Sequence, residues 1–406
     1  MSDRLNVLLL VESLPNPQDR DSIFWIKNSF VFDAMKRLAL RHAMVHPLFV
    51  PYCARLAASF YRRRGLEIHF PSGRDGAVES ILEKTVRYPF LPRLYPWTKY
   101  RALRRALDLN RFDLIHCHTV YDLGLAGLRA ARDFRKPLVV TVYGSDVNWL
   151  FETGERRPDD YIAASTRRVL RGADAVICVS RDLAARVQSL GVDRERTFWI
   201  PNGFDGSVFF PGTAHAEREK LGWPREGKLL LFVGNLFETK GLGDLVEALG
   251  LLQNSGRLPE DFRCLVAGRG TPWGESLKAR LAELGLDKCF EFCGLVSPQR
   301  VASMMRACDV FCLPSWREGW PCVVVEALAC GAPVVGTDIG GINELVTDST
   351  LGLLCPARDP QALAGRIDEA LGRQWDREHI GVSVKEYEYG RVTEKIEEVY
   401  RRVLMR

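Results

Sequence analysis

The stretch PSWREGWPCVVVEALACGAPVVGTDIGGINELV, from Pro314 to Val346, decides the interpretation of this chain. It follows the apolar run 310–313, which predicts a buried strand, and it opens with a turn rich in glycine and proline that contains Glu318. Glu326 lies further along, in a run that predicts the first turns of a helix. A helix N-terminus suits a phosphate, and carboxylates suit sugar hydroxyls. The pair favours a nucleotide-sugar site, and two solvated glutamates on a surface helix are the alternative.

Length and composition indicate two ordinary globular domains. The chain has 406 residues, of which 47% are hydrophobic and 26% are charged, and its net charge of +5 gives no support to a nucleic-acid partner. The first apolar run, 7–11, is too short for a signal segment, and no later run reaches the length of a membrane span. We therefore expect a cytoplasmic protein, at most peripheral on the inner face of the cell membrane.

Eleven cysteines lie scattered along the chain, most of them inside apolar runs. Their spacing does not match a zinc site, and reduced, buried thiols fit a cytoplasmic protein better. The acidic run 19–21 lies in a loop rich in proline and asparagine, where a solvated turn is the preferred interpretation. No metal is expected.

Short β-branched runs alternate with longer amphipathic stretches, which predicts βαβ units and a parallel α/β sheet. The pattern restarts after the Pro-Asn-Gly turn at 201–203, so two Rossmann-like halves are expected. The predicted domains are residues 1–203, residues 204–385 and a C-terminal helix at 386–406 that packs back on the first domain. Expected strands include 6–11, 45–50, 114–116, 138–142, 175–179, 229–233, 263–267, 290–292, 310–313 and 333–336, and a helix is expected at 26–40.

Glycine and polar residues follow many of these strands. In open parallel sheets, ligands bind beyond the carboxyl ends of the strands, so these clusters are expected to line one cleft between the two domains. The alternative for any single glycine is a tight turn between a strand and a helix. The clusters are Gly144-Ser145-Asp146, Gly234-Asn235, Gly268-Arg269-Gly270, Gly294-Leu295 and Glu318-Gly319.

The order of these motifs resembles that of the retaining glycosyltransferases of family 4, which have the GT-B fold. The resemblance covers nearly the whole chain, and the segment 318–346 is its most specific part. It implies two Rossmann-like parallel-sheet domains that face an interdomain cleft. The motifs that carry it are 113–118, 140–146, 179–180, 200–205, Phe232-Val233-Gly234-Asn235-Leu236, Lys240-Gly241, 265–270, 292–294 and 309–346.

The resemblance also implies roles for individual residues. Lys240 should contact the donor diphosphate, Glu318 should face the transferred sugar, and Glu326 should accept hydrogen bonds from the ribose. The residues expected to act in catalysis are Glu318, Lys240, Tyr143 and Asp146. Those expected to bind the nucleotide-sugar are Glu326, Gly234, Asn235, Gly268, Arg269, Leu295, Gly319, Pro321, Cys322 and Val323. His116, His118 and Ser145 are expected on the acceptor side, with a buried structural role as the alternative for His116.

Three departures from the family pattern bear on activity. Asn235 stands where an arginine is common, which removes one phosphate-binding cation. Tyr143 replaces a histidine, although its hydroxyl still donates a hydrogen bond. The glycine of the first loop is replaced by the run 21–24, where the backbone approaches a diphosphate less closely.

A basic and aromatic segment, Arg87–Arg105, lies in the N-terminal half, preceded by Arg62–Arg64. Such mixtures suit an anionic membrane surface, which would lie near a lipid-linked acceptor. A solvated basic helix is the alternative.

These features favour a metal-independent glycosyltransferase that transfers a sugar from a nucleoside-diphosphate sugar to a saccharide or lipid-linked saccharide in surface polysaccharide biosynthesis. No cofactor besides the donor substrate is expected. The alternatives are a degenerate, non-catalytic glycosyltransferase-like partner and a nucleotide-sugar epimerase.

Overall fold

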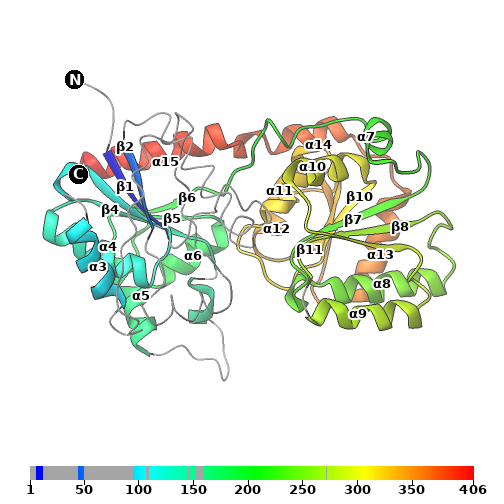
Figure 1. Cartoon of the computed structure of the whole chain (residues 1–406), viewed down its shortest axis with the longest axis horizontal. Coiled ribbons are helices and arrows are strands. Elements are labelled where there is room, and N and C mark those ends of the chain that lie inside the picture. Colours follow the sequence, from blue (N-terminus) through cyan, green and yellow to red (C-terminus); the bar gives the residue numbers. More distant parts are fainter. Residues whose placement is uncertain are drawn as a thin grey trace, which may run out of the picture. The chain divides into compact units, whose positions relative to one another are not determined.

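A computed structural model describes residues 6–11, 44–49, 95–106, 109–144, 146–151, 160–270 and 272–406. Contacts between residues divide the chain into two units, residues 1–201 with 389–406, and residues 202–388 (Figure 1). Several predictions lie outside the described residues: Ser145, the basic run Arg62–Arg64, the acidic run 19–21, the loop 21–24, residues 87–94 of the basic segment and the helix expected at 26–40.

The N-terminal unit contains a six-stranded parallel sheet with the order β2-β1-β3-β4-β5-β6. Its central strands are continuous apolar runs, such as LVVTV in β4, and they are buried because the sheet is covered on both faces. The strands are β1 (Asn6–Val11), β2 (Met44–Phe49), β3 (Leu114–Cys117), β4 (Leu138–Val142), β5 (Ala175–Cys178) and β6 (Thr197–Trp199).

The described helices of this unit are α3 (Tyr95–Ala106), α4 (Asp122–Phe134), α5 (Asp160–Gly172), α6 (Arg181–Ser189) and α15 (Tyr389–Leu404). On α15, apolar residues recur every three or four positions, and Val392, Ile396, Val399 and Tyr400 pack on the same core as sheet residues such as Val139. The C-terminal helix therefore completes the N-terminal unit (Figure 1).

This helix begins at Tyr389, three residues after the predicted start. Residues Lys385–Tyr387 form a short 3-10 turn of the other unit, where the backbone N–H of Phe204 donates to the carbonyl of Tyr387 at 3.0 Å.

The C-terminal unit contains a second six-stranded parallel sheet with the order β12-β11-β10-β7-β8-β9. This is the doubly wound Rossmann order, in which the winding direction reverses between β7 and β10. The strands are β7 (Leu229–Val233), β8 (Arg263–Ala267), β9 (Phe290–Gly294), β10 (Val310–Leu313), β11 (Val334–Thr337) and β12 (Gly352–Cys355).

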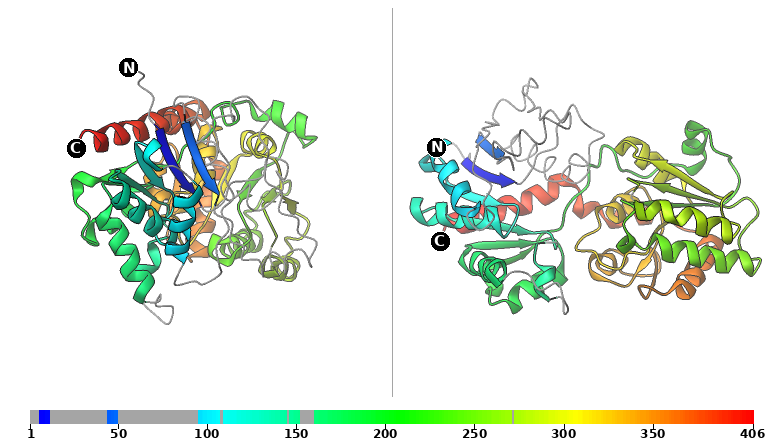
Figure 2. Two further views of the ribbon diagram at one scale, coloured as in Figure 1. Left: turned by 60° about the vertical axis from the view of Figure 1, so that its left-hand side comes forward. Right: turned by 60° about the horizontal axis from the view of Figure 1, so that its bottom comes forward.

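Helices cover both faces of this second sheet, as Figures 1 and 2 show. One face carries α8 (Leu242–Asn254), α9 (Pro272–Glu283) and α13 (Pro360–Gly372). The other carries α7 (Ala214–Leu221), α10 (Pro298–Ala307), α11 (Cys322–Ala329) and α14 (Arg377–Ser383), and α12 (Gly340–Leu345) follows β11. Within the described ranges, no helix has both the length and the apolar character that a membrane crossing requires.

Candidate active site

The predicted donor residues gather at the carboxyl edge of the C-terminal sheet. β7 and β10 are neighbours, with Leu230 opposite Val310, and this is where the winding direction reverses. Gly234 and Asn235 follow β7, and the loop that holds Glu318 follows β10. In a doubly wound sheet, the reversal point is where ligands bind.

The two charged residues expected to contact the diphosphate and the sugar bond directly to each other. The Lys240 Nζ lies 2.6 Å from the Glu318 Oε1. The Glu318 side chain is only 10% exposed, and that of Lys240 is 30% exposed. The sequence separates them by 78 positions, and the adjacency of β7 and β10 brings them together.

Glu326 lies in the second turn of α11, which Pro321 caps at its N-terminus. Burial raises the pKa of the Glu326 carboxyl to about 8, because removing water disfavours the charged form. The side chain is nevertheless partly exposed, so a ligand can reach it. An uncharged carboxyl in the first turns of a helix leaves the positive end of the helix dipole available to an anion.

Close backbone packing supports the loops of this edge. Gly268 has a φ of +152°, and a Cβ atom there would lie 1.8 Å from the Gly234 carbonyl oxygen. A Cβ at Gly341 would lie 2.7 Å from the Gly319 carbonyl oxygen. Glycine at these positions lets the loops after β7, β8, β10 and β11 touch at backbone distance.

The remaining predicted donor residues lie along the same edge. Arg269 and Leu295 follow β8 and β9, which places them one and two strands away from β7, and both side chains are exposed. Cys322 and Val323 form the first turn of α11 and are partly exposed. The donor residues therefore extend over neighbouring strand ends, and the Lys240–Glu318 pair lies at the reversal point.

In the N-terminal unit, His118 and Tyr143 lie at the ends of β3 and β4. The His118 Nδ1 and the Tyr143 hydroxyl are 2.6 Å apart, and the His118 backbone N–H donates to the Leu10 carbonyl of β1 at 2.9 Å. Burial lowers the pKa of His118 to about 4, so its ring is neutral near pH 7. The winding direction of this sheet reverses between β1 and β3. In doubly wound sheets, ligands bind at such a point.

Asp146 supports the loop after β4. Its Oδ1 accepts hydrogen bonds from the backbone N–H groups of Tyr143 at 3.1 Å and Gly144 at 2.9 Å. The carboxylate thereby orders the turn that carries Tyr143.

His116 lies in the core of the N-terminal unit, which is the buried structural role left open as the alternative to an acceptor-side position. Its ring is fully buried, with Nδ1 2.7 Å from the Tyr400 hydroxyl and Nε2 2.7 Å from the Thr141 hydroxyl. Burial lowers its pKa well below the ordinary value, and the neighbouring His118 lowers it further. Because side chains alternate between the faces of a strand, His116 points into the core that α15 covers.

Two family models match the chain. The model described as Glycosyltransferase Family 4 matches residues 52–207, and the model described as Glycosyl transferases group 1 matches residues 214–387. A D-inositol 3-phosphate glycosyltransferase from Xylanimonas cellulosilytica is 31% identical over 286 residues, which is 68% of this chain and 67% of that protein. The chain belongs to the family 4 glycosyltransferases.

For some other relatives the shared region is shorter. A D-inositol 3-phosphate glycosyltransferase from Acidothermus cellulolyticus is 30% identical over 64% of this chain, and the match spans 60% of that relative's length.

Solved structures show the fold of this family 4 member. The structure of Anabaena HepE in complex with UDP and glucose matches 98% of this chain and 100% of that one, with a TM-score of 0.72 and 20% identity. Sucrose-phosphate synthase from Thermosynechococcus elongatus matches 99% of this chain and 100% of that one, with a TM-score of 0.77 and 20% identity. The predicted GT-B fold, with two parallel-sheet α/β domains, is confirmed.

Trp316 ties the Lys240 loop to the Glu318 loop, and sequence reasoning missed it. Its indole Nε1–H donates to the Asp244 Oδ2 at 2.6 Å, and its backbone N–H donates to the Thr239 carbonyl at 2.9 Å. The Arg358 guanidinium lies over its ring, 4.1 Å from the centroid. Trp316 therefore links the loop that holds Glu318 to the turn that holds Lys240 and to the start of α8.

We expect Trp316→Phe to weaken binding of a nucleotide-sugar donor about fivefold, because losing one hydrogen bond of this kind removes about 1 kcal/mol. Trp375→Phe is the matched control, because the Trp375 indole donates to the Ala370 carbonyl at 3.0 Å, on α13. Isothermal titration calorimetry measures the two affinities. Equal donor affinity in the two variants would show that the Trp316 bond is only structural.

Trp320 anchors the other end of the same loop. Its Nε1–H donates to the Asn202 carbonyl at 3.0 Å, and its ring packs edge-on against Tyr387, with centroids 5.2 Å apart. A buried indole N–H needs a hydrogen-bond acceptor, so a tryptophan in a loop indicates that such a bond exists. The sequence does not identify which residue accepts it.

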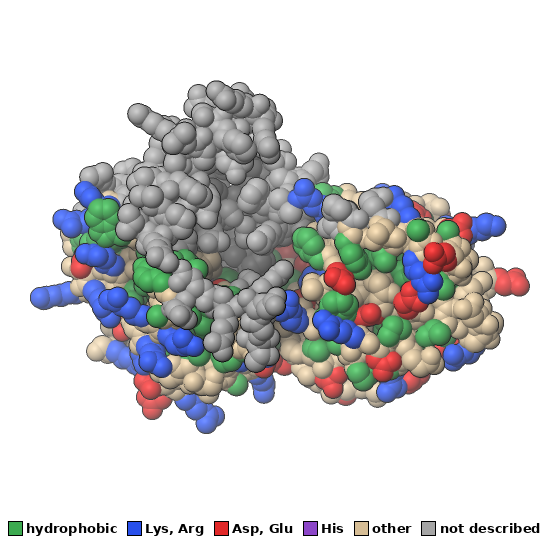
Figure 3. Space-filling view, turned by 90° about the horizontal axis from the view of Figure 1, so that it is seen from below, with side chains coloured by type: hydrophobic (Ala, Val, Ile, Leu, Met, Phe, Trp, Pro, Cys, Tyr) green, Lys and Arg blue, Asp and Glu red, His purple; other side chains and the backbone are tan. Residues whose placement is uncertain are grey.

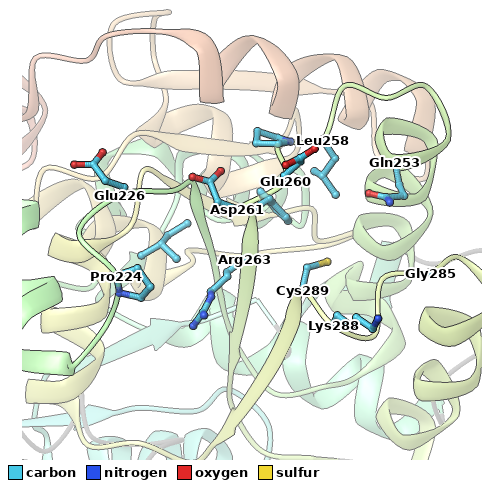
Figure 4. A pocket seen from close by; sticks show the side chains of 13 residues that line it. Pro224, Glu226, Gln253, Leu258, Glu260, Asp261, Arg263, Gly285, Lys288 and Cys289 are labelled. Atoms are coloured by element: carbon cyan, nitrogen blue, oxygen red, sulfur yellow. The ribbon is translucent and has the colours of Figure 1, made fainter.

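A separate pocket of about 470 Å³ lies at the opposite edge of the C-terminal sheet (Figure 4). It is lined by residues that precede or begin β7, β8 and β9, among them Glu226, Asp261, Arg263 and Lys288. None of the predicted site residues lines it, so we do not assign donor binding to it.

Proposed function

We propose that this protein is a retaining glycosyltransferase that moves a sugar from a nucleoside-diphosphate sugar to a saccharide or lipid-linked saccharide acceptor in surface polysaccharide biosynthesis. The observation that carries the proposal is the Lys240–Glu318 pair at the reversal point of the C-terminal sheet. Glu326 and the N-terminus of α11 follow the same loop. The names of the relatives, and a structural neighbour in complex with UDP and glucose, support a donor of this class.

In this proposal the C-terminal unit binds the donor. Lys240 turns from Glu318 toward the diphosphate, and the loop from Gly319 to Val323 offers backbone N–H groups to phosphate and sugar. Glu326 accepts hydrogen bonds from the ribose hydroxyls, and Glu318 holds a hydroxyl of the transferred sugar. The cationic Lys240 thereby contacts the anionic diphosphate, and the carboxyl groups of Glu318 and Glu326 contact hydroxyl groups of the donor.

The reaction then needs no protein nucleophile. The bond between the anomeric carbon and the β-phosphate oxygen breaks, and the acceptor oxygen bonds to that carbon on the same face. The acceptor proton passes to an oxygen of the leaving diphosphate. Lys240 stabilises the negative charge that develops on that diphosphate.

The acceptor lies against the N-terminal unit in this proposal. The neutral His118 and the Tyr143 hydroxyl form a hydrogen-bonding pair suited to an acceptor hydroxyl, on a loop ordered by Asp146. A cytoplasmic location, peripheral to an anionic inner membrane, fits the basic and aromatic composition of 95–105 in α3.

Above about pH 8, where the Glu326 carboxyl is charged, we expect Glu326→Ala to weaken donor binding about 100-fold. Hydrogen bonds to a charged acceptor contribute about 1.5–3 kcal/mol each. Thermal-shift screening of the wild type against UDP-, GDP- and ADP-sugars finds the donor, since a bound ligand raises the melting midpoint. Donor turnover is then compared in wild type, Glu326→Ala and Glu398→Ala, where Glu398 is an exposed control on α15.

Several outcomes of this experiment would contradict the proposal. Donor binding that Glu326→Ala leaves unchanged would remove Glu326 from the donor site. A bound donor without turnover across many acceptors would indicate the non-catalytic partner, and conversion of the donor sugar without an acceptor would indicate an epimerase.

The same variants test the protonation of Glu326. Because its pKa is raised to about 8, the free protein carries a neutral Glu326 below that pH, and the carboxylate that accepts ribose hydrogen bonds forms as the pH rises. Donor affinity should therefore increase between about pH 6 and pH 8 and level off above that. Glu326→Gln should flatten this dependence.

A further inference from the structure

The N-terminal unit contains a pocket of about 330 Å³ over the outward face of α4, between α3 and α5. We call it the α4 pocket. Its charged and aromatic lining consists of Arg129, Arg132, Arg168, Asp133, Trp97 and Tyr161. None of these residues belongs to the donor or acceptor positions described above.

The three helices bring this lining together from distant parts of the sequence. Leu125, Arg129, Arg132 and Asp133 recur along α4 at the spacing of one helical face. Trp97 lies near the start of α3 and Tyr161 near the start of α5, and both α3 and α5 pack against α4. Arg129 and Arg132 therefore line the α4 side of the pocket, Trp97 lines the α3 side, and Tyr161 and Arg168 line the α5 side.

Contacts hold the charged groups in place. The Tyr100 hydroxyl donates to Asp133, and the Arg129 guanidinium lies 5.1 Å from the centroid of the Tyr100 ring. The Arg101 guanidinium lies 4.5 Å from the centroid of the Trp97 ring. Trp97 remains 42% exposed and Tyr161 43% exposed, so both rings offer a surface to a ligand.

The charge of the α4 pocket is unbalanced. Three guanidinium groups line it against the single carboxylate of Asp133, which accepts the Tyr100 hydrogen bond. No ion pair joins Arg129, Arg132 or Arg168 to another residue in the described part of the chain. Figure 3 shows that Lys and Arg side chains gather on the described surface of this unit, on the left of the view. Guanidinium charge that no ion pair among the described residues neutralises favours an anionic ligand.

The chemistry of the lining narrows the ligand class. The planar fork of arginine matches the oxygens of a phosphate, which it binds through paired hydrogen bonds. Exposed tryptophan and tyrosine rings add an amphipathic wall for the carbon skeleton next to the phosphate. A small concave site with a few converging polar groups is the usual form of a ligand pocket.

We propose that the α4 pocket binds a phosphate group carried on a polyol, such as a sugar phosphate or the glycerol phosphate of a lipid headgroup. Arg132 and Arg168 hold the phosphate, and Trp97 packs against the polyol. The site is separate from the proposed transfer reaction and does not rest on it. It gives the N-terminal unit a second binding position for a phosphorylated molecule.

Titration calorimetry with glucose 6-phosphate tests the proposal. The double variant Arg132→Gln/Arg168→Gln should weaken binding at least about tenfold, because each substitution removes a charge-assisted contact. The control Arg194→Gln/Arg300→Gln removes the same charge from exposed positions elsewhere and should stay within about twofold of the wild type. Trp97→Ala should weaken glucose 6-phosphate more than inorganic phosphate.

The source of the phosphate is decided by a parallel arm with vesicles. A lipid headgroup is the source if the wild type binds vesicles that contain phosphatidylglycerol but not vesicles of pure phosphatidylcholine. The Arg132→Gln/Arg168→Gln variant should then lose this vesicle binding. Saturable binding of glucose 6-phosphate without vesicle binding supports a soluble sugar phosphate.

Two outcomes would overturn the proposal. The first is that the wild type binds neither glucose 6-phosphate nor the phosphatidylglycerol vesicles. The second is that Arg194→Gln/Arg300→Gln loses as much affinity as Arg132→Gln/Arg168→Gln, which would show that the overall positive charge of the protein accounts for binding. The Lys240→Ala variant separates this site from the donor site. It should lose transfer and keep the affinity of the α4 pocket, so each proposal fails or stands independently.

Discussion

Replacing Lys240 with alanine should lower the rate of sugar transfer about 100- to 1,000-fold, which is the usual effect of removing one preorganised group that stabilises developing charge. The Lys240 Nζ is the cation that the sheet places beside the α11 loop, where the proposal puts the diphosphate. In the free protein it bonds to Glu318 at 2.6 Å, so it is held near the site before the donor arrives. The loss should appear mainly in kcat, because the leaving diphosphate carries most negative charge in the transition state.

The expected loss must be separated from damage to the fold. Removing Lys240 leaves the largely buried Glu318 without its cation, which lowers stability as well. Lys240→Met keeps the packing of the stem, Lys240→Arg keeps the charge, and Lys288→Ala removes an exposed lysine of the same unit. Steady-state kinetics on variants with equal melting midpoints measure the effect. Full activity of Lys240→Met would show that Lys240 only neutralises Glu318.

Replacing Gly268 with alanine should destabilise the C-terminal unit by about 3 kcal/mol or more, which is the range of the largest single-residue effects. The φ of +152° belongs to a region that residues with a Cβ rarely adopt. The added atom would also lie 1.8 Å from the Gly234 carbonyl oxygen, so the loops after β7 and β8 must separate. Thermal unfolding followed by circular dichroism measures the loss, and donor affinity should fall with it.

Gly270→Ala is the matched control for this prediction. Gly270 lies two residues further along the same loop, and a Cβ there would have no neighbour within 4 Å. Its substitution should change stability by no more than about 0.5 kcal/mol. Equal melting curves for the two variants would contradict the close approach of Gly268 to Gly234.

Sequence reasoning predicts a ligand-binding edge in the C-terminal unit because its signals are local. Glycine, proline and a carboxylate directly after an apolar run mark a strand end, and the parallel sheet then collects such ends at one edge. Glu318, Gly234 and Gly268 are predicted in this way, whereas Glu326 is predicted from the helical run that follows the loop. The alternation of strands and helices likewise predicted the α/β class, which the structure confirms.

The residues that sequence reasoning missed or left open form hydrogen bonds with residues far away in the sequence. Trp316 acts through Asp244, 72 positions away, and Trp320 through Asn202, 118 positions away. For His116 the sequence leaves an acceptor-side position and a buried structural role open, and its partner is Tyr400, 284 positions away on α15. Local patterns do not specify which residues meet across such distances.

The sequence by itself determined the alternating α/β architecture, the family and the loops that carry the predicted donor-site residues. Each of these follows from residue types at short spacing, which set local conformation and strand ends. Only the tertiary structure decided that Lys240 bonds to Glu318, that His116 lies in the core under α15, and that three arginines converge over α4. The physical reason is that strand order and helix packing determine which distant residues meet. Strand order and helix packing depend on the burial of whole helix and sheet faces, and not on the residues next to each other in the sequence.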